Sequence, residues 1–98
     1  MLHSFPNIKD GRKTVASAGT AERLVSSNTP CKVVTITALI GNTNEVVIGG
    51  STVVASAGTR QGVPLFAGQS VTLYVEDLYA IYIDSVTNGE GVSFIYQF

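Results

Sequence analysis

Three side chains of the kind that bind cations stand close together near the end of the chain. Asp84, Asn88 and Glu90 share one loop-forming segment, and carboxylate and amide oxygens are the ligands that Ca²⁺ takes in proteins. Their spacing lacks the alternation of an EF-hand loop, and Val86 stands where a ligand is wanted. Asn88-Gly89 also suits the positive φ angles of a tight hairpin turn. We therefore expect a hairpin turn here, no bound cofactor, and Asp84, Asn88 and Glu90 as the candidate metal ligands.

Nucleophilic catalysis needs a nucleophile beside a base, and the chain holds one histidine, His3. His3 lies in an unpatterned segment whose nearest carboxylate in sequence is Asp10. The lone cysteine, Cys31, excludes an intrachain disulfide, and no zinc-binding spacing accompanies it. We therefore expect a protein that is not an enzyme and has no catalytic residues.

Aromatic side chains offer a second kind of site. The chain has four tyrosines, four phenylalanines and no tryptophan, and such rings stack on sugars or bases when they are exposed together. Tyr79, Phe94 and Tyr96 alternate with other residues in strand-like segments and share their faces with aliphatic side chains. This pattern favours a core or a subunit interface. A carbohydrate-binding module that uses the tyrosines and the loop at residues 84–91 is the alternative.

Composition limits the partners. Charged residues make up 13% of the chain, about half of the roughly 25% that is usual for soluble domains. The net charge of −1 gives no field that attracts nucleic acid, and no apolar run reaches the roughly 18 residues of a membrane span. The N-terminus lacks the features of a signal peptide, which predicts a protein made and used without secretion. So few charges favour self-association or docking onto a larger assembly.

Strand-like alternation extends through most of the chain. Residues 31–40, 70–76, 79–83 and 92–97 alternate with period two, and short turns rich in Gly, Asn and Ser separate them. This predicts a single domain at residues 14–98, an antiparallel β-sandwich or flattened barrel of about seven or eight short strands. We expect residues 13–26 to form a hairpin and residues 68–98 to form a three-stranded meander. The expected core consists of Val33, Ile36, Leu39, Val47, Val71, Leu73, Val75, Ile81, Ile83, Val92 and Phe94.

A six-residue repeat occurs twice. Val-Ala-Ser-Ala-Gly-Thr stands at residues 15–20 and again at residues 54–59. One interpretation is an internal duplication that places equivalent turns in two sheets. The other is coincidence in a chain rich in Ala, Ser, Gly and Thr, since the flanking residues do not match.

Two segments are candidates for contact with a partner. Residues 1–13 show no period and are expected to form an extended N-terminal arm that is dispensable for folding. Residues 60–68 contain Pro64, which cannot donate to a central β-ladder and so indicates a loop, an edge strand or a crossover. The expected contact residues are Leu2, Phe5 and Pro6 in the arm, and Arg60, Val63, Leu65 and Phe66 in the second segment.

Several segments together resemble a known class of protein. They are residues 31–38, 41–43, 47–49, 51–53, 68–73, 77–78 and 81–85. In these segments the chain resembles small all-β virion proteins of tailed bacteriophages that serve as capsid decoration (cement) proteins. The resemblance implies a non-enzymatic structural protein on the capsid surface of a virion, made in the host cytoplasm and bridging subunits of the major capsid protein. It also implies a homo-oligomer, with a trimer favoured. A tail, neck or fibre module of the virion is the alternative within the same class.

Overall fold

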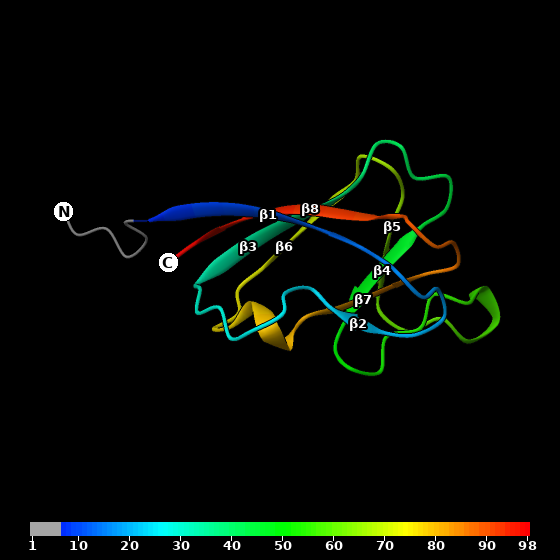
Figure 1. Ribbon diagram of the computed structural model, residues 1–98, viewed down its shortest axis with the longest axis horizontal. Coiled ribbons are helices and arrows are strands. Elements are labelled where there is room, and N and C mark those ends of the chain that lie inside the picture. Colours follow the sequence, from blue (N-terminus) through cyan, green and yellow to red (C-terminus); the bar gives the residue numbers. More distant parts are fainter. Residues whose placement is uncertain (1–6) are drawn as a thin grey trace.

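The computed structural model describes residues 7–98, which form eight β-strands in two antiparallel sheets (Figure 1). Two short 3₁₀ helices, η1 (Ala57–Thr59) and η2 (Leu78–Ala80), lie in the connections. Within this part of the chain no helix has the length and apolarity needed to cross a membrane. The strands are β1 (Ile8–Thr14), β2 (Glu22–Arg23), β3 (Val33–Ala38), β4 (Val46–Gly49), β5 (Val63–Leu65), β6 (Ser70–Leu73), β7 (Tyr82–Ser85) and β8 (Gly91–Gln97). The expected all-β sandwich is confirmed.

The order of the strands identifies the topology. The first sheet has the order β1-β8-β3-β6 and the second has the order β2-β7-β4-β5. The first half of the chain therefore pairs with the second half in reverse order: β1 with β8, β2 with β7, β3 with β6, and β4 with β5. This nested antiparallel pairing is that of an eight-stranded jelly roll.

The topology overturns two expected local pairings. β6, β7 and β8 do not form a meander, because β7 belongs to the second sheet while β6 and β8 belong to the first. The expected hairpin at residues 13–26 is also absent, because β1 and β2 lie in different sheets. Alternation with period two shows which side chains share a face, but it does not show which sheet a strand joins.

The N-terminal arm is shorter than expected. Residues 8–13, which the sequence places in an arm outside the domain, belong to β1 and pair with β8 along its whole length. The two strands lie so close that a Cβ at Gly91 would overlap the Lys13 carbonyl, and the ring of Phe94 covers the inner face of Gly11. The arm was misassigned because Gly11 and the charged residues beside it hide the strand period. Leu2, Phe5 and Pro6 lie outside the described residues.

The core lies between the two sheets. Val47 is buried in a separate cluster with Val53 and Ala55. The other five buried residues of the expected core lie between the sheets, namely Ile36, Ile81, Ile83, Val92 and Phe94. Three more pack half-buried against them, namely Val71, Leu73 and Val75. Val33 and Leu39 are the exceptions: they are only half-buried, because the inner face of β3 carries Val34, Ile36 and Ala38 instead. Both faces of this strand are β-branched or apolar, so the sequence did not distinguish the inner face from the outer one.

Candidate functional site: the loop end of the sandwich

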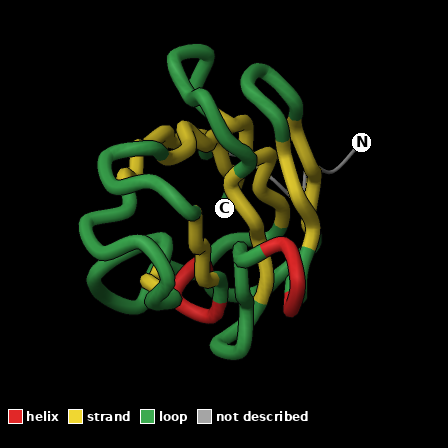
Figure 2. The backbone as a smooth tube through the Cα atoms, turned by 90° about the vertical axis from the view of Figure 1, so that its right-hand side faces the viewer, coloured by secondary structure: helices red, strands yellow, loops and turns green. Residues whose placement is uncertain are grey.

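Four connections meet at one end of the molecule, which we call the loop end. They are residues 15–21, 39–45, 66–69 and 86–90, and each crosses from one sheet to the other. They lie opposite the end that carries the C-terminus (Figure 1), and in Figure 2 they face the viewer. Loops held on a rigid scaffold are the usual place for recognition, so this end is the candidate functional site.

Asp84 holds two distant segments to the end of β7. Its side chain is 1% exposed. Oδ1 accepts hydrogen bonds from the N–H groups of Gly19 (3.0 Å) and Ser85 (2.9 Å), and Oδ2 accepts one from the N–H of Ala55 (2.9 Å). Backbone N–H groups compensate a buried carboxylate for the water it loses. Asp84 therefore acts as a structural brace in the described part of the chain.

The two copies of the hexapeptide meet at this carboxylate. In each copy the threonine N–H donates to the serine carbonyl three residues earlier at 3.1 Å, which closes a four-residue turn. The turns differ at the glycine, since Gly19 has a φ of +91° whereas the second copy forms η1 without a positive φ. The first copy links the two sheets, while the second lies between β4 and β5 of the same sheet. The copies thus form similar local turns at unequal places in the fold, which favours coincidence over the interpretation of an internal duplication.

Glu90 performs the same task for the loop at residues 39–45. It is buried, and its carboxylate accepts hydrogen bonds from the N–H and Oγ1 of Thr43 (both 2.6 Å) and the N–H of Asn44 (3.1 Å). Burial opposes ionisation, but these donors outweigh it and hold the pKa of Glu90 below its ordinary value of 4.5. The ionised Glu90 carboxylate therefore stabilises the folded protein. This contribution is complete at pH values above the ordinary pKa and is lost as the pH falls through the lowered pKa.

Two asparagines complete the bracing. Asn88 Oδ1 accepts a hydrogen bond from the N–H of Ala18 at 2.7 Å. Asn42 donates from Nδ2 to the carbonyl of Gly91 (2.9 Å) and accepts from the N–H of Gly91 (3.2 Å). Of the residues at this turn only Gly89 has a positive φ, +87°. The predicted Asn88-Gly89 hairpin is therefore wrong, because residues 86–90 are a crossover between sheets.

The candidate metal ligands are thus all used within the protein. Asp84 and Asn88 both accept hydrogen bonds from the loop at residues 15–21, and Glu90 accepts hydrogen bonds from the loop at residues 39–45. Among residues 7–98 no group of three or more His, Cys, Asp or Glu side chains is arranged to hold a metal ion. These three side chains hold neighbouring loops in place.

Three of these loops present large apolar side chains outward. Ile40 is 87% exposed, Phe66 58% and Val86 50%, and each lies on a different connection of the loop end. The N–H of Gly68 donates to the Ala38 carbonyl at 3.0 Å, which places the loop of Phe66 beside the loop of Ile40. Large apolar side chains on several adjoining loops are a feature of interaction surfaces. Ile40 and Val86 were not predicted as contacts, although each is an apolar residue beside turn-forming Gly, Asn or Thr.

The four expected contact residues between positions 60 and 66 differ in their surroundings. Val63 and Phe66 are exposed and stay candidates for contact with a partner. Leu65 is buried in the core, so its prediction as a contact is wrong. Arg60 pairs with Glu45 (3.3 Å) and donates from Nε and Nη2 to the Ala55 carbonyl, so it braces the loop between β4 and β5.

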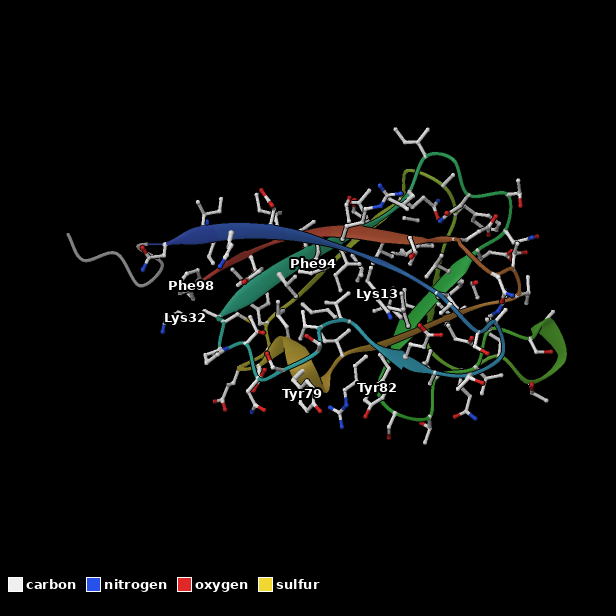
Figure 3. The ribbon with its side chains drawn as sticks, in the orientation of Figure 1. Lys13, Lys32, Tyr79, Tyr82, Phe94 and Phe98 are labelled. Carbon is white, nitrogen blue, oxygen red and sulfur yellow. The ribbon has the colours of Figure 1, made fainter. Side chains whose placement is uncertain are left out.

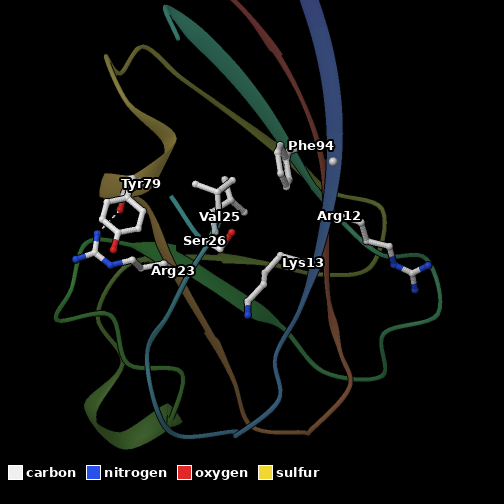
Figure 4. A pocket seen from close by; sticks show the side chains of 9 residues that line it. Arg12, Lys13, Arg23, Val25, Ser26, Tyr79 and Phe94 are labelled. Carbon is white, nitrogen blue, oxygen red and sulfur yellow. Dashed lines mark hydrogen bonds between the residues drawn. The ribbon is translucent and has the colours of Figure 1, made fainter. Parts of the chain in front are cut away.

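A cleft of about 540 Å³ opens between β1 and the segment after β2 (Figure 4). Two of its cationic groups, Arg23 and Lys13, are already engaged. The Arg23 guanidinium carbon lies 3.7 Å from the centre of the Tyr79 ring, and Lys13 Nζ lies 2.9 Å from Glu22 Oε1. Burial opposes ionisation of Glu22, but Lys13 and two backbone N–H groups outweigh it and lower the pKa of Glu22. Since Arg12, Lys13 and Arg23 point in different directions in Figure 4, they do not converge on one anion.

The described tyrosines form no shared stacking platform. Tyr96 is buried and lies beside Phe94 and Phe98, with ring centres 6.1 and 5.8 Å away. The Arg23 guanidinium lies over the rings of both Tyr79 and Tyr82, which are labelled in Figure 3. Tyr74 is 78% exposed but belongs to neither group. The arrangement gives the carbohydrate-binding alternative no row of exposed rings.

No family model, curated protein or solved structure matches this chain.

Proposed function

We propose that this protein is a non-enzymatic structural protein of a phage virion, a capsid decoration (cement) protein that binds the major capsid protein. The observation that carries the proposal is the loop end, where braced loops expose Ile40, Phe66 and Val86. The resemblance in sequence to decoration proteins of tailed phages supports the same role.

Two further features support a role in holding a shell together. The jelly roll is an architecture that viral capsid proteins use, although lectins and cupins use it as well. A rigid, low-charge contact surface also suits a protein that opposes internal pressure by burying surface on neighbouring capsid subunits. Internal hydrogen bonds fix the loops in advance, so docking costs little ordering entropy.

The test is reconstitution on the particle. Purified protein is added to capsids of the encoding phage from which it has been stripped, and binding and cryo-EM density are measured. We expect density on the shell, and at least about tenfold weaker binding for the double variant Ile40→Asp/Phe66→Asp, since buried interface anchors carry most of the binding energy.

The matched control is Ile95→Asp, which changes an exposed apolar residue on the outer face of the first sheet. It should bind like the unaltered protein, and circular dichroism should show all variants folded. Density on the tail or neck would overturn the decoration role in favour of the alternative virion module. Unchanged binding of the double variant would remove the loop end as the contact surface.

A further inference from the structure

The two open sides of the sandwich differ sharply in charge. The side formed by β1 and β2 carries nearly half of the charged residues of the chain, namely Lys9, Asp10, Arg12, Lys13, Glu22 and Arg23. The opposite side is formed by β5 and β6, and residues 61–75, which include both strands, contain no charged residue. This is the longest uncharged run in the chain.

β6 has an open edge on this uncharged side. It pairs with β3 and is the last strand of the first sheet. The N–H of Ala38 donates to the Gln69 carbonyl, and hydrogen-bonded residues alternate along an antiparallel pair. The backbone N–H and C=O groups of Ser70, Thr72 and Tyr74 therefore point away from β3, available to another strand.

An apolar cleft of about 290 Å³ lies beneath this edge. Its lining includes Val71, Leu73 and Val75 from β6 and its continuation, all only half-buried, and Val63 from β5, which is 45% exposed. A strand added to β6 would bring its own side chains over this cleft. The edge thus offers backbone hydrogen bonds and apolar burial together, the two components of β-strand addition.

The other three edges of the sandwich are closed to strand addition. β1 carries Lys9, Asp10, Arg12 and Lys13, and charges on an edge strand oppose pairing. β5 contains Pro64, which has no N–H to donate, and β2 has only two residues. Among the described edge strands, only β6 is longer than two residues and contains neither a charged residue nor a proline.

We propose that β6 pairs in antiparallel fashion with β6 of a second copy of this chain. The partner must present an uncharged open edge with apolar side chains beneath it, and the same edge of another copy meets that requirement without placing like charges opposite each other. The pairing joins the two four-stranded first sheets into one continuous sheet. It brings the two apolar clefts together across a two-fold axis, where each covers the other.

This pairing gives a dimer, not the trimer that the sequence resemblance implies. A closed ring of three would need β6 to bind a different edge of its neighbour, and charge, proline or short length blocks those edges. The inference depends only on the edges of the sandwich and is independent of the proposed role in a virion.

Sedimentation equilibrium of the isolated protein over a range of concentrations tests the proposal. We expect a species of twice the 10.3 kDa chain mass that dissociates on dilution. Thr72→Pro removes an outward N–H without breaking a backbone hydrogen bond to β3, and Thr72→Lys puts like charges near the two-fold axis. Both variants lose the hydrogen bond between the hydroxyls of Thr72 and Thr35. Each should weaken dimerisation at least about tenfold. In the dimer, hydrogen exchange at the Thr72 amide should be slow, and dilution should accelerate it.

The matched control is Asp10→Pro on β1. Asn7 and Phe98 exchange backbone hydrogen bonds, so alternation places the Asp10 N–H on the free side of that strand. This variant should form the dimer normally. Two results overturn the proposal: a monomer or trimer at every concentration, or a dimer that both folded Thr72 variants still form with unchanged affinity.

Discussion

At the scale of single residues, the side chains that seem most able to do chemistry hold the structure together. Asp84, Asn88 and Glu90 carry the oxygens that a calcium ion would use, yet each accepts backbone N–H groups from another segment. The sequence identified the cluster because carboxylates and amides in a turn-forming segment are conspicuous. It could not show that the donors come from residues 18–19, 43–44 and 55, since loops distant in sequence meet only in the folded chain.

Asp84→Ala should destabilise the protein by about 2–4 kcal/mol, because the buried N–H of Ala55 loses its acceptor and the Gly19 loop loses one of its acceptors. Asp84→Asn should cost less, since it keeps one acceptor oxygen. Urea unfolding followed by circular dichroism measures both. As a control, Asp10→Ala on exposed β1 should stay within about 0.5 kcal/mol of the unaltered protein.

The same measurement separates a brace from a metal site. If Asp84 helped to bind calcium, added Ca²⁺ would raise the unfolding temperature of the unaltered protein by mass action. We expect no rise in the unfolding temperature. A clear rise in the unaltered protein that is absent in Asp84→Ala would contradict the bracing role.

At the scale of elements, β1 is the strand that the sequence concealed. Four of its seven residues are charged and one is glycine, a composition that is typical of a loop or arm. The charges suit an edge strand instead: Lys13 faces inward opposite Val92 and reaches Glu22, and inward charge discourages further pairing. Pro64 was easier to interpret, because its missing N–H excludes a central strand. Of the loop, edge strand or crossover that the sequence allowed, the structure has the edge strand, β5.

Deletion of residues 1–12 should therefore unfold or strongly destabilise the domain, by at least about 3 kcal/mol, because it removes most of β1 and uncovers Phe94. Deletion of residues 1–6 alone should leave the described sheets intact. Thermal unfolding of both truncated proteins beside the full chain measures the difference. Equal stability of all three proteins would show that β1 contributes little, as the original assignment of an arm implied.

If Leu2, Phe5 and Pro6 contact the capsid, the shorter deletion should weaken attachment to the particle without changing stability. The reconstitution assay reports attachment and thermal unfolding reports stability, so a failure to fold is distinguished from a loss of contact.

At the scale of the whole molecule, the jelly roll places the two ends of the described chain side by side. The N–H of Asn7 donates to the Phe98 carbonyl and the N–H of Phe98 donates to the Asn7 carbonyl, both at 3.0 Å. β1 and β8, the first and last strands of the chain, thus pair with each other, and β1 forms one edge of the first sheet.

A circular permutant should fold on this basis. Joining Phe98 to Asn7 through a short flexible linker and opening the chain between Gly58 and Thr59, in exposed η1, keeps every strand pair. We expect an unchanged circular dichroism spectrum and a loss of no more than about 2 kcal/mol, because cutting an exposed turn removes few contacts. A permutant without β structure would contradict the pairing of the termini.

The sequence by itself determined the all-β class, the low charge and the exclusion of Pro64 from a central strand. These properties follow from alternation, composition and the chemistry of one residue, all of which are local. Only the tertiary structure decided which strands share a sheet, why Asp84 and Glu90 are buried, and that Ile40, Phe66 and Val86 occupy one end. The physical reason is that a period of two fixes the face of each side chain, while pairing between distant strands depends on packing across the whole sandwich.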